Sequence, residues 1–166
     1  MLKVINGDIF DSTEKYIAHQ CNCVSNKAAY LAYDIFNKYP YADIYSSRRI
    51  FKHDQAMIFG KTETPGEIVI RGNGKDQRYV IAILGQYYPG RPRYPNSGLD
   101  QYKSRQVYFY EALCEIANIE DLHSVALPYG IGCGAAGGDW KVYYKIIENF
   151  AKFLDGKADV FIYKKD

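Results

Sequence analysis

The stretch "LPYGIGCGAAGGDW" (residues 127–140) constrains the fold of this chain more than any other. It places five glycines within nine residues, between an apolar segment and an amphipathic one. Each glycine weakens a helix by about 1 kcal/mol relative to alanine. A folded protein therefore keeps such a cluster only where the backbone needs unusual freedom or where another group must approach it closely.

The order of strand, glycine loop and helix predicts an anion site in this stretch. Residues 132–137 match the spacing G-x-G-x-x-G. Main chain without Cβ atoms lets several N–H groups point at one place, and a following helix adds partial positive charge. Phosphate or pyrophosphate is the expected ligand. The alternative is tight packing of the strand against the helix, with no ligand.

Two familiar nucleotide loops fit this stretch poorly. A P-loop is excluded because no Gly-Lys-Ser/Thr follows the glycines. A Rossmann fingerprint belongs to the first strand–helix turn of a fold that needs several more strands. Here only one further helix and one further strand are predicted after the loop.

Hydrophobic periodicity predicts an α/β protein whose helices cover a mixed sheet. Apolar runs predict strands at 2–6, 16–22, 67–72, 78–84, 124–130 and 159–163, with a hairpin turn around Asn73-Gly74. Helical spacing predicts helices at 27–39, 99–119 and 140–154. The buried face predicted for the helix at 99–119 consists of Val107, Tyr110, Leu113, Cys114 and Ala117.

Length and charge narrow the class of protein. A chain of 166 residues is expected to form a single domain over 1–166. Its net charge of +2 provides no large basic field for nucleic acid. No segment has the length and apolarity of a signal peptide or of a membrane span. We therefore expect a cytoplasmic or nuclear protein whose cysteines are reduced.

Several polar residues near strand ends are candidate site residues. Asp8 follows the first predicted strand, where it either binds a ligand hydroxyl or amino group or forms an ordinary Asx turn. Gln20 and Asn22 share one face of the second strand, and buried amides at that position need partners such as ribose hydroxyls. Asp139 directly precedes the last helix, where it is either an N-cap or, as a second possibility, a catalytic carboxylate.

The opposite face of the second strand carries His19, Cys21 and Cys23. These residues suggest either small buried side chains or a zinc site. Zinc is disfavoured because no second Cys/His pair occurs at metal-ligand spacing. We expect no metal and no cofactor.

Taken together, four segments resemble the macrodomain, an ADP-ribose-binding module. They are "NGDIF", "IAHQCNC", "LAYDIFNKYPYAD" and "ALPYGIGCGAAGGDW", which occur in the same order and span nearly the whole chain. The resemblance implies a three-layer α/β/α sandwich with a mixed, mostly parallel central sheet. The "HxCNC" segment is similar to fungal ADP-ribose-1″-phosphate phosphatases, and the glycine segment is similar to viral and phage macrodomains.

The resemblance also implies a role for each candidate residue. Asp8 would bind the adenine amino group, the backbone of Ile9 would contact adenine or the nearby phosphate, and Asn22 would face the distal ribose. His19 would take part in catalysis, and Gln86 would lie near the same cleft. The backbone amides expected to wrap the pyrophosphate belong to Gly132, Cys133, Gly134, Ala135 and Ala136.

Two departures from the macrodomain pattern affect the expected activity. Ala28, Ala29 and Tyr30 stand where macrodomains usually carry glycines. Gln86 and Ala136 stand where the branch that removes ADP-ribose from glutamate has its lysine and its aspartate, so that lysine mechanism is not supported.

We expect a protein that binds ADP-ribose and hydrolyses a derivative of it at the distal ribose, with His19 and Asp139 as the catalytic candidates. The substrate would be ADP-ribose-1″-phosphate or an ADP-ribosyl adduct on protein or nucleic acid. The first alternative is a non-catalytic reader of ADP-ribose or ADP-ribosylated partners. A thiol or metal protein built on His19, Cys21 and Cys23 is a third hypothesis.

Overall fold

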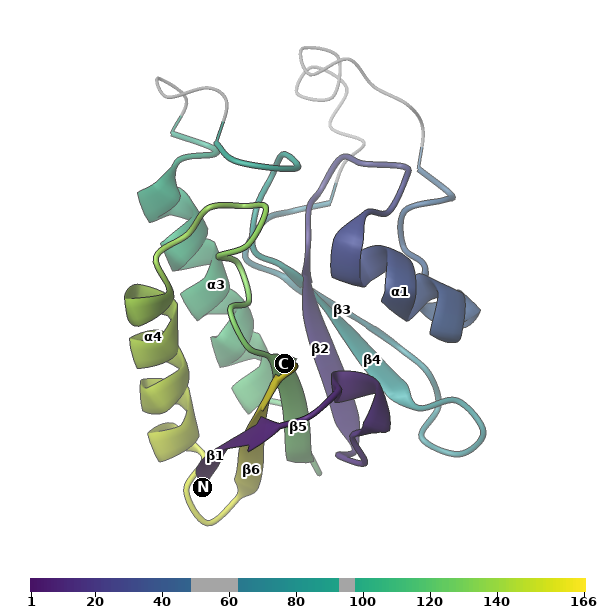
Figure 1. Ribbon diagram of the computed structural model, residues 1–166, viewed down its shortest axis with the longest axis vertical. Coiled ribbons are helices and arrows are strands. Elements are labelled where there is room, and N and C mark those ends of the chain that lie inside the picture. The colour runs from purple at the N-terminus through teal and green to yellow at the C-terminus, as the bar shows by residue number, and fades with distance from the viewer. Residues whose placement is uncertain (49–62, 93–97) are drawn as a thin grey trace.

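The structure, a computed structural model, describes residues 1–48, 63–92 and 98–166, and they form three layers around one sheet (Figure 1). The stretches 41–66 and 85–98, for which the sequence predicts no helix or strand, lie partly outside the described residues. The strands are β1 (Leu2–Asn6), β2 (Tyr16–Cys21), β3 (Ile68–Arg71), β4 (Tyr79–Leu84), β5 (His123–Pro128) and β6 (Ala158–Lys164).

The described strands form one mixed, mostly parallel sheet in the order β1-β6-β5-β2-β4-β3. Neighbouring strands are parallel except for β3, which pairs antiparallel with β4. The predicted hairpin joins these two strands, and its turn is closed by a 2.8 Å hydrogen bond from Gly74 N to Gln77 O. The predicted sheet is thereby confirmed.

Helices cover both faces of the sheet (Figure 1). One face carries α3 (Tyr102–Ala117) and α4 (Trp140–Phe153), and the other carries α1 (Tyr30–Lys38). Two short 3₁₀ turns, η1 (Ile9–Asp11) and η2 (Pro40–Ala42), complete the described elements. The predicted last helix is confirmed, and its residues Tyr143, Ile147 and Phe150 are buried in the core on this face of the sheet. Within the described residues no helix is both long and apolar enough to cross a bilayer.

The structure corrects the apolar face predicted for α3. Val107 and Tyr110 are 51% and 57% exposed, and Cys114 is exposed as well. Leu113 is buried as predicted, and Ala117 packs partly buried against the core. The other buried residues of the helix are Arg105, Phe109, Ala112 and Ile116. Both sets have helical spacing, so periodicity alone did not distinguish them. The buried set includes an arginine, which sequence analysis places on the surface by default.

The helix predicted from residue 27 begins at Tyr30 in the structure. Ala29 is its N-cap and makes no side-chain capping hydrogen bond. Tyr30 itself has a φ of 55°, in the left-handed region that non-glycine residues rarely occupy. Such a conformation costs about 1–3 kcal/mol and occurs preferentially at ligand sites.

The strand connections create a crevice at one edge of the sheet. The chain leaves β5 toward α4 on one face and leaves β2 toward α1 on the other, and these two strands are neighbours. Ligands of open α/β sheets bind at such a switch point, outside the carboxyl ends of the strands. The predicted glycine loop and the predicted Asn22 both follow these two strands.

Candidate functional site

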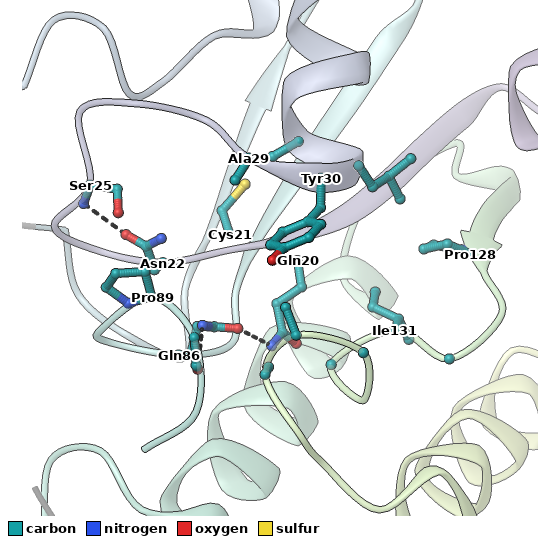
Figure 2. A pocket seen from close by; sticks show the side chains of 18 of the residues that line it. Gln20, Cys21, Asn22, Ser25, Ala29, Tyr30, Gln86, Pro89, Pro128 and Ile131 are labelled. Atoms are coloured by element: carbon teal, nitrogen blue, oxygen red, sulfur yellow. Dashed lines mark hydrogen bonds between the residues drawn. The ribbon is translucent and has the colours of Figure 1, made fainter. Parts of the chain in front are cut away.

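A pocket of about 380 Å³ lies at this switch point (Figure 2). Its volume falls in the range of small-molecule sites. Four segments and Tyr45 line it. The segments are the end of β2 with its loop, the start of α1, the loop after β4, and the glycine loop after β5. From the glycine loop the lining residues are Gly130, Ile131, Gly132, Gly134, Ala135 and Ala136.

The glycine loop satisfies some of its own backbone groups and leaves others unpaired. Cys133 N donates to Gly130 O at 2.9 Å, Gly137 N donates to Gly134 O at 3.0 Å, and Gly138 N donates to Gly132 O at 3.1 Å. Among the loop residues that line the pocket, five amides have no acceptor in the described part of the chain: Gly130, Gly132, Gly134, Ala135 and Ala136. Unpaired N–H groups need a partner, and the pocket provides room for one.

Two of the glycines show different reasons for being there. A Cβ atom on Gly132 would lie 2.6 Å from Tyr143 Cε2, and its φ of 77° is left-handed, so the fold itself requires this glycine. At Gly134 the φ is ordinary, and a Cβ atom would meet no atom within 4 Å. The protein interior does not require glycine at Gly134. A ligand that approaches the backbone closely would explain why this position has no side chain.

The start of α1 faces the same pocket with further unpaired donors. Ala29, Tyr30, Leu31 and Ala32 all line the pocket. The first N–H groups of a helix have no partner within the helix, and no side chain in the described ranges 1–48, 63–92 and 98–166 caps them. A helix start also favours negative charge. Sequence analysis missed these donors, although one signal was present: no Ser, Thr, Asp or Asn precedes the helix at the N-cap.

Asn22 presents an amide at the far end of the pocket. Its Oδ1 accepts hydrogen bonds from Val24 N at 3.1 Å and from Ser25 N at 2.8 Å, and its own N donates to Tyr45 Oη at 2.8 Å. These bonds fix the side chain, and its Nδ2 has no partner in the described part of the chain. This amide can therefore donate to a ligand hydroxyl, as the resemblance implies.

Gln86 lines the pocket, but both of its polar atoms are engaged. Its Oε1 accepts from Gln20 Nε2 at 2.6 Å, and its Nε2 donates to Tyr88 O at 2.8 Å. Gln86 is only 7% exposed. Figure 2 shows this Gln20–Gln86 pair at the floor of the pocket, with the ring of Tyr30 pointing toward it from α1. Gln86 therefore shapes the pocket floor.

Asp8 and Ile9 lie outside the pocket lining, although Asp8 follows a strand that ends at the same edge of the sheet. Asp8 and Ile9 follow β1, and β6 lies between β1 and β5 in the sheet. Asp8 Oδ1 accepts from Phe10 N at 2.9 Å, and Oδ2 pairs with Lys165 Nζ at 3.0 Å. The Phe10 amide first, and Lys165 second, lower the pKa of Asp8 below its usual value. The turn interpretation of Asp8 is therefore confirmed, and its surface ion pair is weak enough to exchange for a ligand.

His19 is fully buried and is absent from the pocket lining. Its ring packs edge-on against Phe36, with centroids 5.4 Å apart, and its nitrogens lie 3.6 and 3.7 Å from Cys21 Sγ. Burial lowers the pKa of His19 to about 3. This geometry does not bring His19 to the pocket as an acid or a base. No group of three or more His, Cys, Asp or Glu side chains able to hold a metal occurs among the described residues.

Asp139 and Cys133 also lie away from the pocket lining. Asp139 Oδ1 accepts from Lys141 N at 3.0 Å, so the residue is the N-cap of α4, as the preferred interpretation held. Cys133 uses its amide within the loop and directs its thiol to Ile131 O. Its contribution to the anion cradle stays a prediction, and in this structure its amide already has an acceptor, Gly130 O.

Comparison with known proteins identifies the fold to which this chain is similar. No protein-family model matches the chain, and no curated protein matches it. Solved structures match nearly all of it. The macrodomain of Thermus aquaticus DarG has a TM-score of 0.69 at 21% identity and covers 98% of this chain and 97% of its own.

The chain has a macrodomain fold. The macrodomain of Mycobacterium tuberculosis DarG is similar with a TM-score of 0.66 at 19% identity, over 98% of this chain and 97% of its own. A mutant Oceanobacillus iheyensis macrodomain with ADPR has a TM-score of 0.63 at 17% identity, over 98% of this chain and 84% of its own. The predicted fold class and the predicted resemblance are confirmed at the level of the macrodomain fold.

Proposed function

We propose that this protein binds ADP-ribose and that the pocket amides hold its diphosphate. One observation carries the proposal: two sets of unpaired backbone N–H groups face one pocket from opposite sides. The glycine loop provides one set and the start of α1 provides the other. A diphosphate has enough acceptor oxygens to satisfy both sets, and hydrogen bonds from amides to a charged acceptor are the stronger kind.

The remaining parts of the ligand follow from the neighbours of this cradle. Asn22 Nδ2 at one end of the pocket would donate to a hydroxyl of the distal ribose. Tyr129 lines the opposite end, and its N donates to Tyr163 O on β6 at 2.9 Å. Beyond β6 lies β1, which Asp8 follows, so an adenine group extending in that direction would reach Asp8. The ADPR carried by the Oceanobacillus iheyensis neighbour supports this choice of ligand.

The described pocket favours a reader over the hydrolase that sequence analysis predicted. None of the described residues that line it is an aspartate, a glutamate or a histidine. Cys21 and Tyr45 line it, and burial raises the pKa of Cys21 to about 12 and that of Tyr45 well above its usual value. A general base works best with a pKa near the operating pH. Neither side chain meets that condition.

Two assays test the proposal. Isothermal titration calorimetry is expected to show one ADP-ribose bound per chain, with competition by ADP. Absence of heat at millimolar ligand would contradict ADP-ribose binding. In parallel, incubation with ADP-ribose-1″-phosphate and with an ADP-ribosylated protein is expected to release neither phosphate nor ADP-ribose. Turnover in either reaction would restore the hydrolase prediction and leave the binding proposal intact.

A further inference from the structure

The largest fully buried side chain of α3 is an arginine. Arg105 is 2% exposed, and its partner Asp100 is completely buried. The pair is bidentate: Arg105 Nε lies 2.8 Å from Asp100 Oδ1, and Nη2 lies 2.7 Å from Oδ2. Burying two charges is costly even when they pair, so stability alone is a poor explanation for this arrangement.

The other donors of Arg105 connect two loops that form walls of the pocket. Nη2 donates to Tyr88 O at 3.1 Å, and Nη1 donates to Gly90 O at 2.5 Å and to Ala136 O at 3.4 Å. Tyr88 and Gly90 belong to the loop after β4, whereas Ala136 belongs to the glycine loop. Asp100 strengthens the first attachment, because its Oδ1 accepts from Tyr87 N at 3.2 Å.

These attachments fix the distance between the two walls. Gly90 and Ala136 both line the pocket, while Arg105 does not. Holding the Ala136 carbonyl restricts rotation of the adjoining peptide planes. The bond directly holds the peptide plane that Ala136 O shares with the Gly137 N–H, and it limits rotation of the preceding plane, which carries the Ala136 N–H.

We propose that Arg105, fixed by Asp100, is a positioning residue that sets the width of the pocket and the aim of the glycine-loop amides. The chemistry requires arginine, because only a planar guanidinium can hold a carboxylate bidentately and reach three carbonyl oxygens on two loops. A lysine at this position would keep the positive charge, but it could not make the bidentate hydrogen bonds to Asp100. For ligand affinity, the inference rests on the proposed binding of ADP-ribose.

The test compares Arg105→Lys with Leu113→Ala. Leu113 is a buried residue of the same helix, 2% exposed, that does not line the pocket, so its truncation lowers stability and leaves the hydrogen bonds of Arg105 in place. Hydrogen exchange is measured first, with no ligand present. The amides of Tyr87, Gly137 and Gly138 are expected to exchange at least tenfold faster in Arg105→Lys than in Leu113→Ala, relative to the amides of β5 in each variant. Equal local exchange in the two variants would overturn the inference.

Calorimetry with ADP-ribose forms the second arm. Arg105→Lys is expected to bind at least tenfold more weakly than the wild type, whereas Leu113→Ala binds like the wild type. Wild-type affinity in a folded Arg105→Lys protein would overturn the inference and leave the proposed function standing. A wild type that binds no ADP-ribose would remove the proposed function, and hydrogen exchange would still decide the positioning role. Should Arg105→Lys not fold, Asp100→Asn serves as the variant in both arms, because it keeps the side-chain shape and removes the paired charge.

Discussion

Replacing Gly134 by valine tests whether glycine at this position is required for ligand binding or for folding. No atom of the described residues lies within 4 Å of the position that a Cβ atom would take at Gly134, and the φ of Gly134 is ordinary. The folded chain should therefore accept the side chain. The unfolded chain loses freedom, so the free energy of unfolding is expected to stay the same or to rise by about 0.5 kcal/mol.

Binding should respond in the opposite direction. A valine side chain would stand between the diphosphate and the amides of Gly134 and Ala135. Each hydrogen bond from an amide to a charged group contributes about 1.5–3 kcal/mol. Losing one or two of them should cost about 3 kcal/mol, which corresponds to a roughly 100-fold increase in the Kd for ADP-ribose.

The assay is calorimetry with ADP-ribose, together with chemical denaturation. Gly98→Val is the matched control, since no atom of the described residues lies within 4 Å of the Cβ position at Gly98 and this residue does not line the pocket. It should bind like the wild type. Gly132→Ala is unsuitable because Tyr143 would clash with the new methyl group. A Gly134→Val protein of normal stability that binds ADP-ribose within twofold of the wild type would refute the reasoning.

Two other residues give further predictions. Because burial lowers the pKa of His19 from 6.5 to about 3, the folded state binds fewer protons there than the unfolded state. The stability linked to His19 is complete above pH 6.5 and falls on acidification by roughly 1.4 kcal/mol per pH unit. Denaturation at pH 7 and pH 5 should therefore show a smaller loss in His19→Leu than in the wild type; identical losses would contradict the assignment. Asp139→Ala should lower the free energy of unfolding by about 1 kcal/mol through loss of the cap and leave the Kd for ADP-ribose unchanged; weakened binding would place Asp139 at the ligand.

Sequence patterns predicted the sheet, because each strand carries a local signal that survives packing. Alternating and continuous apolar runs marked all six described strands, and Asn73-Gly74 marked the hairpin. The buried face of α3 was not predictable in the same way. Its two candidate faces have equal spacing, and the choice depended on Asp100, a partner outside the helix that neutralises Arg105.

The site was predicted in outline, and its atomic detail was not. The glycine spacing indicated an anion cradle. Only the folded loop shows that the Cys133 N–H already donates to Gly130 O and that the Gly134 N–H has no acceptor among the described residues. The α1 donors were not predicted, because the helix was expected to begin at residue 27 and its uncapped first turn lies at Tyr30. His19 was assigned through a motif, whereas the structure turns its ring away from the pocket toward Phe36.

The most direct measurement of the central claim is an amide NMR titration with ADP-ribose. The claim is that main-chain N–H groups on the two sides of the pocket capture a diphosphate. The account predicts saturable downfield shifts at Gly134, Ala135 and Ala136 and at Leu31 in α1, with little change at Cys133, whose amide is already bonded. Saturable binding that leaves the amides of Gly134, Ala135 and Ala136 unshifted would contradict it.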